Sequence, residues 1–307
     1  MRKVIFFALL VVATRFAQSA DTRPKISGID HVDFYTTDPT ANQRLYTTVL
    51  GLESFPPVEA AQTRRYQVGS QWVGYSPAPD PRSTNRMNHV AFRTADCEAL
   101  RIYLQSKAIK VPDSVTILKT GERSFRIRDP EDNTIEFVQP TGGHLIKMRT
   151  LGHSEEAVAQ PISMHMIHVG FVVHNRNAED HFYRDILGFH LYWQGGMQDN
   201  KTDWVAMQVP DGTDWLEYML NIGPNADQHT TGVMNHISLG VHDIKEAQAK
   251  LESRGWKPHG KEKAQMGRDG KWQLNLYDPD FTRIELMEFK PVEKPCCSEF
   301  HGQHPSD

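Results

Sequence analysis

The sequence has little cysteine, no long apolar segment and no excess of basic charge. Three cysteines among 307 residues do not provide a disulfide framework for the fold. The main apolar run near the start, residues 4–13, is too short to cross a bilayer as a helix. With 34 lysines and arginines against 38 acidic residues the formal charge is −4, and no basic run alternates with aromatic residues. A nucleic-acid partner is therefore not expected.

Residues 1–20 have the pattern of a secretory signal peptide. Arg2 and Lys3 precede the short apolar run, and small residues near Ala17 and Ala20 offer a cleavage site. We expect an exported protein, periplasmic or secreted, that has no association with the membrane once the leader is removed.

The rest of the chain contains an internal duplication. The strand-like segment at His31 returns at His168, the segment around His89 returns at His236, and the segment around Glu136 returns at Glu285. The offset grows along the chain, which is typical of loop insertions in the second copy, and each copy is about 120 residues long. We predict a first module at 21–140, a linker at 141–161, a second module at 162–290 and a disordered tail at 291–307.

Four polar residues of the second copy stand inside short apolar runs that are typical of β-strands: His168, Glu217, His236 and Glu285. A histidine or glutamate in such a run needs a polar environment, because burying it unpaired is costly. Each one alone could simply face solvent. Because the pattern occurs twice, we predict instead a divalent-metal site, whose two imidazoles and two carboxylates suit Zn, Ni, Co, Mn or Fe(II).

Several motifs resemble those of the vicinal oxygen chelate superfamily, which includes glyoxalase I, fosfomycin and bleomycin resistance proteins, methylmalonyl-CoA epimerase and type I extradiol dioxygenases. The motifs are the strand-opening His31 and His168, the helix ends at residues 50–52 and 187–189, and the closing segments 128–136 and 277–285. The resemblance covers roughly residues 27–290. It implies an α+β fold of two modules, each made of paired βαβββ units whose curled mixed sheet forms a metal-binding cup.

The resemblance also implies which positions bind the metal. In glyoxalase-type members the ligands come from the first, fourth, fifth and eighth strands, which match His168, Glu217, His236 and Glu285. The first copy keeps three of these positions, and Gly74 stands at the fourth. Its three residues form a second site or a relic: His31, His89 and Glu136. The sequence leaves open whether half-modules pair within a module or are swapped between modules.

The expected activity is that of a glyoxalase-like lyase or isomerase, acting on a small substrate that chelates the metal through vicinal oxygens. The metal would stabilise an enolate, and Glu285 and Glu217 would move the proton. An exported protein would not meet cytosolic glutathione or coenzyme A conjugates, so we expect another vicinal-oxygen compound. The protein is expected to be a monomer or a homodimer.

Two alternatives remain. The first is Fe(II)-dependent extradiol cleavage of a catechol, but the resemblance would then place an acid/base tyrosine and histidine where this chain has Asn275 and Met266. The second is a non-enzymatic small-molecule-binding protein of the resistance type. Such proteins usually lack the metal ligands, whereas this chain keeps seven ligand-type residues.

Overall fold

The computed structural model describes residues 22–55, 63–118, 121–141, 159–258, 260 and 262–307. The expected leader and most of the expected linker lie outside these residues. Within the described residues, none of the helices combines the length and the apolar character needed to cross a membrane.

The first module forms one eight-stranded mixed sheet in the order β2-β3-β4-β1-β5-β8-β7-β6. The strand β1 pairs in parallel with β4 and antiparallel with β5, so these central strands lie side by side. The strands are β1 (Ile26–Thr36), β2 (Ser54–Phe55), β3 (Arg64–Val68), β4 (Gln71–Pro77), β5 (Met87–Thr94), β6 (Thr116–Ile117), β7 (Arg123–Arg128) and β8 (Thr134–Gln139).

The second module repeats this topology, with the order β10-β11-β12-β9-β13-β16-β15-β14. Equivalent strands occupy equivalent places, which confirms the duplication predicted from the sequence. The strands are β9 (Met166–Val172), β10 (His190–Gly195), β11 (Trp204–Gln208), β12 (Trp215–Met219), β13 (His236–Val241), β14 (Gln265–Met266), β15 (Trp272–Tyr277) and β16 (Arg283–Glu288).

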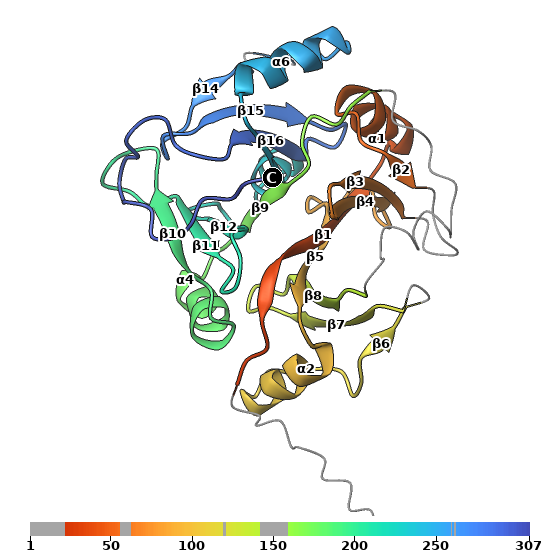
Figure 1. The fold of residues 1–307 in the computed structure, drawn as a ribbon, viewed down its shortest axis with the longest axis vertical. Helices are drawn as coiled ribbons and strands as arrows, with labels where there is room; N and C mark the ends of the chain where they lie inside the picture. The colour runs from red at the N-terminus through yellow and green to blue at the C-terminus, as the bar shows by residue number, and fades with distance from the viewer. Residues whose placement is uncertain (1–21, 56–62, 119–120, 142–158, 259, 261) are drawn as a thin grey trace, which may run out of the picture.

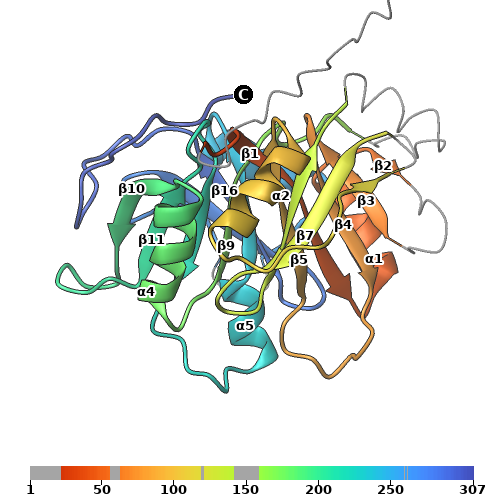
Figure 2. The same ribbon diagram turned by 90° about the horizontal axis from the view of Figure 1, so that it is seen from below.

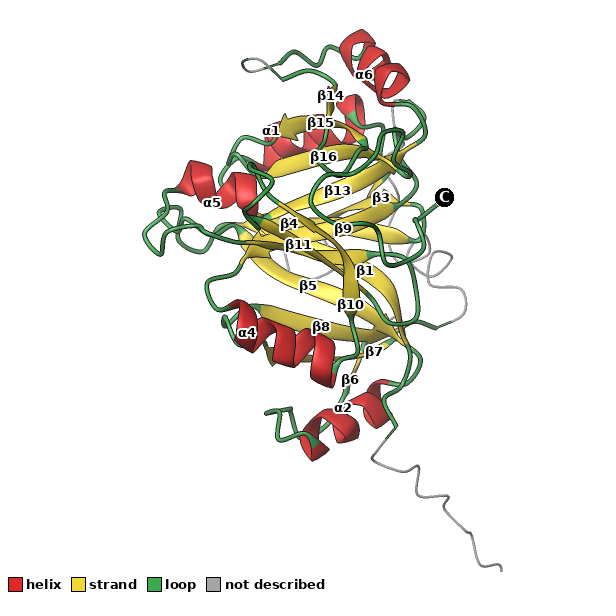
Figure 3. Ribbon diagram, turned by 90° about the vertical axis from the view of Figure 1, so that its left-hand side faces the viewer, coloured by secondary structure: helices red, strands yellow, loops and turns green. Residues whose placement is uncertain are grey.

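The helices are short and lie around the sheets, as Figure 3 shows. They are α1 (Pro39–Arg44), α2 (Cys97–Ser106), α4 (Arg176–Glu179), α5 (Gln228–Met234) and α6 (Ile244–Ser253), and π-helical segments at Leu45–Val49 and Asp180–Ile186 continue α1 and α4. Each of the five begins at an Asp or Asn whose side chain accepts a backbone N–H of the first turn. The helix α5 was not expected from the sequence.

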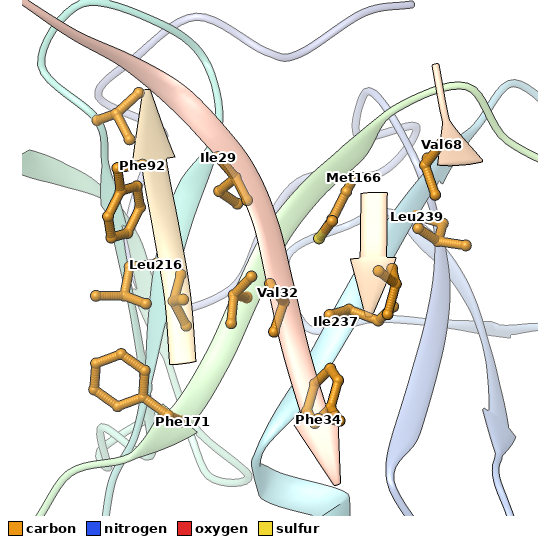
Figure 4. Packing of buried hydrophobic residues seen from close by; sticks show 14 of the residues in the cluster. Ile29, Val32, Phe34, Val68, Phe92, Met166, Phe171, Leu216, Ile237 and Leu239 are labelled. Carbon is orange, nitrogen blue, oxygen red and sulfur yellow. The ribbon is translucent and has the colours of Figure 1, made fainter. Parts of the chain in front are cut away.

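The two sheets meet along β1 and β9, and their concave sides face away from each other (Figures 1 and 2). One hydrophobic core joins both modules, and it includes Val32 and Phe34 of β1 together with Phe171 and Ile237 of the second module (Figure 4). Side chains alternate between the two faces of a strand, so His31 and Asp33 lie on the other face of β1, toward the hollow of the sheet. The fold therefore places the polar residues of each central strand inside its own cup.

The closing motifs of the two modules fasten the modules to each other. Tyr75 of the first module donates a hydrogen bond to Asp278 of the second over 3.0 Å, and Tyr183 of the second donates to Asp129 of the first over 3.2 Å. Each aspartate also accepts backbone N–H groups of its own turn. The aspartate of each motif thus contributes to the interface between the modules, whereas the glutamate that ends the motif, Glu136 or Glu285, lies beside a histidine of its own cup.

The C-terminal segment differs from the expectation of disorder at 291–307, because it packs against β10 and β11. Trp193 donates its indole N–H to the carbonyl of Cys296, Gln208 donates to the carbonyl of Gln303, and the Phe300 ring lies 4.8 Å from the Tyr192 ring. A disulfide joins Cys296 to Cys297. The polar composition of the segment did not predict this packing, because the residues that it contacts lie about 100 residues away in the chain.

Candidate metal centre

The four residues predicted in the second copy lie on four adjacent strands, β12, β9, β13 and β16. Gly170 on β9 stands opposite Glu217 on one side and opposite His236 on the other. A Cβ atom at Gly170 would lie 2.1 Å from Cε1 of the His236 ring, so glycine is required for that ring to cross β9. The absence of a side chain here lets the ring and the carboxylate reach one point.

The ligand-type atoms converge at the floor of the second cup. The Nε2 atoms of His168 and His236 are 3.1 Å apart. Glu285 Oε2 lies 3.3 Å from His168 Nε2, and Glu217 Oε2 lies 3.4 Å from His236 Nε2. His236 Nδ1 donates to the carbonyl of Met234 over 2.8 Å, so its Nε2 carries the lone pair, which accepts a hydrogen bond from Arg283 over 2.7 Å. The donor set and its convergence fit a divalent transition metal.

Burial controls the ionisation of these groups. It lowers the pKa of His168 and of His236 well below the usual value, so both imidazoles are neutral, which is the form that binds a metal. Burial also raises the pKa of Glu217 and that of Glu285 to about 7, against the opposing influence of the Arg283 guanidinium.

A cavity of about 310 Å³ opens directly above Glu217 and Glu285. Its wall is aromatic on the side of β10, β11, β12 and the C-terminal segment, with Tyr192, Trp193, Trp204, Trp215 and Phe300. The opposite side is polar, with Gln273, Asn275 and Arg283. The shape and lining suit a small substrate that has an unsaturated or cyclic part and a polar end.

A buried lysine lies behind this wall. Lys271 is fully buried, and its ammonium lies 4.7 Å from the centre of the Trp215 ring and 5.3 Å from that of Tyr192. Burial lowers the pKa of Lys271 to about 8, although Asp269, Glu285 and Glu217 act in the other direction. The charged form thus lies among aromatic faces and adds positive charge near the two carboxylates.

The first cup brings together His31, His89 and Glu136, as predicted. The Nε2 atoms of the two histidines are 3.1 Å apart, and Glu136 Oε2 lies 3.2 Å from His89 Nε2. Two further residues, which sequence reasoning missed, reach this cup. They are Asp33, grouped with the two histidines as a candidate metal ligand, and Arg126, whose Nε donates to Glu136 over 2.7 Å.

Both ligand sets form within their own module, because the strands that carry each set belong to one sheet. Swapped half-modules are not what this structure shows. Asp33 had a signal in the sequence, since it follows His31 by two residues and so shares its strand face. Arg283 had the same kind of signal, since it precedes Glu285 by two residues on β16. Arg126 and Lys271 had none, because they lie outside the strands that carry the predicted ligands.

Comparison with known proteins agrees with this architecture. The family model of the Glyoxalase/Bleomycin resistance protein/Dioxygenase superfamily matches residues 28–137 and 165–286, one match for each module. No curated protein sequence matches the chain significantly.

Several solved structures have the same architecture. One is homoprotocatechuate 2,3-dioxygenase of Brevibacterium fuscum in complex with 3,4-dihydroxyphenylacetate. Its sequence is 18% identical, its TM-score is 0.60, and the alignment covers 87% of this chain and 82% of that one. The Mn(II)-bound glyoxalase of Novosphingobium aromaticivorans has 16% identity and a TM-score of 0.61 over 91% and 86% of the two chains. The 2,3-dioxygenase LapB of Pseudomonas sp. KL28 has 13% identity and a TM-score of 0.58 over 93% and 96%.

These identities establish the fold alone, whereas the family model spans both modules and most of the chain. The duplicated sheets, the paired cups and the two matches lead to one assignment: the chain belongs to the glyoxalase/bleomycin resistance protein/dioxygenase superfamily.

Proposed function

We propose that the second module is the active site of a divalent-metal-dependent lyase or isomerase of the glyoxalase type. The observation that carries this proposal is the second carboxylate, Glu217, beside the His168, His236 and Glu285 set. A bound divalent ion would supply Lewis acidity toward two adjacent oxygens of a substrate. The four residues would hold that ion.

The roles of the chain's own groups follow from their places in the cup. Glu217 lies on β12 and Glu285 on β16, on either side of the two strands that carry the histidines. One can accept a carbon-bound proton and the other can return it, so that a proton crosses the substrate between them. The aromatic side chains that line the same space would limit the access of water to the reacting groups.

Ring cleavage of a catechol is the second candidate, because two of the similar structures described above are 2,3-dioxygenases. The side chains nearest the cup argue against it. Asn275 stands opposite Glu285 on β15, Met266 lines the same cavity, and neither can act as an acid or a base. A resistance-type binding protein is the third candidate, and it would leave the converging ligands without a role.

The natural substrate is proposed to be a small vicinal-oxygen compound outside the cytosol, if residues 1–20 act as a leader. Glutathione and coenzyme A conjugates would then be excluded by location. The metal is proposed to be Zn, Ni, Co, Mn or Fe(II), and the assembly a monomer or a homodimer.

The test measures whether the protein exchanges a carbon-bound proton of a substrate with solvent when oxygen is absent. Protein loaded in turn with Co²⁺, Mn²⁺, Zn²⁺ and Fe²⁺ is incubated anaerobically in D₂O with a panel of α-hydroxycarbonyl compounds, and NMR follows deuterium entering the carbon next to the carbonyl. We expect exchange or isomerisation with at least one metal, lost in Glu217→Gln while the metal is retained. Oxygen uptake with catechols by the Fe²⁺ form, with no anaerobic exchange, would contradict the proposal and establish the dioxygenase.

A further inference from the structure

The two cups differ at one pair of facing strand positions. In the second module, Gly170 on β9 faces Glu217 on β12. In the first module, the equivalent pair is Asp33 on β1 and Gly74 on β4. The carboxylate and the glycine have exchanged strands, so each cup still receives one carboxylate from this pair.

The exchange is enforced by steric contact. A Cβ atom at Gly74 would lie 1.8 Å from Oδ1 of Asp33, so the fourth strand cannot carry a side chain while Asp33 holds its place. In the second cup the space above Gly170 is taken by the His236 ring instead. When the sequence is considered alone, Gly74 means that the fourth strand of the first cup provides no ligand. In the structure, the same glycine leaves space for the carboxylate of Asp33.

The Asp33 carboxylate is buried and lacks a hydrogen-bond partner at one oxygen. The residue is 6% exposed, Oδ1 accepts no hydrogen bond, and Oδ2 lies 3.7 Å from His89 Nδ1, beyond hydrogen-bond distance. One ligand atom from each of His31, Asp33 and His89 lies within 4.8 Å of the others. A buried carboxylate without a partner is costly, and a cation held with the two imidazoles would satisfy it.

The surrounding groups orient this set. Asp30 accepts from His31 Nδ1 over 2.7 Å and is itself held by Arg93 Nε over 3.0 Å, so His31 Nε2 faces the cup. A histidine that binds a metal usually donates its other ring N–H to a carboxylate or carbonyl in this way. Arg126 donates to Glu136 over 2.7 Å and to His89 Nε2 over 3.2 Å. The second module has the neutral Asn275 at the equivalent strand position, and there Arg283 donates to His236 Nε2 over 2.7 Å.

We propose that the first cup is a second divalent-cation site, with His31, Asp33 and His89 as its ligands. Asp33 replaces the missing carboxylate of the fourth strand, and Arg126 neutralises Glu136. The Arg126 side chain is 52% exposed, so it can move toward solvent when an ion enters. Because this set has one carboxylate fewer than the second cup, the first cup binds the same ion more weakly.

The experiment counts Co²⁺ ions on the full chain. Untagged protein is stripped with chelator, dialysed against Co²⁺ and analysed by elemental analysis and by the visible spectrum of bound cobalt. We expect two ions per chain in the wild type and one in Asp33→Gly. The double variant Asp33→Gly/Gly74→Glu copies the arrangement of the second cup and should recover the second ion, which also shows that loss in the single variant is not caused by misfolding.

Three results would overturn the proposal. One ion in the wild type that persists in Asp33→Gly and is lost in Glu285→Gln leaves the second module as the sole site. One ion in the wild type but two in Arg126→Gln shows that the guanidinium keeps cations out of the first cup. Two ions in Asp33→Gly show that Asp33 is not a ligand. The first result leaves the function proposed for the second module intact, so the two proposals fail separately.

Discussion

At the scale of single residues, glycines and carboxylates decide what each cup can hold. Gly170 admits the His236 ring, and Gly74 admits the carboxylate of Asp33. The sequence alone does not predict either contact, because a glycine within a strand is equally consistent with a bulge or a close backbone approach. The seven ligand-type residues could be predicted because each is a polar residue in an apolar strand. Asp33 had a signal, because it shares the strand face of His31, whereas Arg126 had none, because only the pairing of β7 with β8 brings it to the cup.

We predict that Glu285→Gln abolishes turnover and weakens metal binding by about tenfold or more, the scale on which even supporting residues affect metal affinity. The substitution keeps the shape of the side chain and removes the charge that balances the ion beside His168. Glu136→Gln is the matched variant in the other cup, and it should affect turnover much less, because Arg126 already engages that carboxylate. Turnover and metal content are measured on both. Equal damage by the two substitutions would contradict a catalytic second module.

At the scale of elements, the regular parts of both modules could be predicted, whereas the irregular parts could not. The apolar runs around the seven ligand-type residues marked the central strands of both modules. The helix α5 contains two threonines and a glycine, which have low helix propensity, and packs against β9 and β16. Tertiary contact therefore decides its conformation, and the same holds for the C-terminal segment.

The start of the second module's first helix contains a buried acid that predicts how stability depends on pH. Burial and the nearby Asp129 and Glu131 raise the pKa of Glu179 to about 9, from an ordinary 4.5. Between these values the folded chain keeps a proton that the unfolded chain releases, so the free energy of unfolding falls as the pH rises. The first module has a neutral residue, Asn42, at the equivalent buried position.

Glu179→Gln should therefore flatten this dependence and raise the melting temperature by about 2 °C or more at pH 8. Melting curves between pH 5 and pH 9 measure the effect. Asp185→Asn, an exposed acid in the same helical stretch whose pKa Arg184 lowers, serves as the control and should keep the wild-type slope. An unchanged slope in Glu179→Gln would show that this carboxyl does not remain protonated in the folded chain.

At the scale of the whole molecule, duplication has produced two cups on opposite sides of one core. The reciprocal Tyr75–Asp278 and Tyr183–Asp129 hydrogen bonds join the modules, and the central strands leave each concave face free for polar residues. The resemblance of the sequence predicted this plan. It did not predict that the C-terminal segment, through Phe300, completes the wall of the second cup.

The most direct test of the central claim, a metal held in the second module, is elemental analysis of the untagged chain beside a His168→Ala/His236→Ala variant. The chain should hold at least one divalent transition metal that a chelator removes, and the variant should hold one ion fewer, because both imidazoles that converge at 3.1 Å are gone. No stoichiometric metal in the wild type would contradict the account and would favour a metal-independent binding protein. Equal metal in both proteins would contradict it by showing that His168 and His236 do not hold the ion.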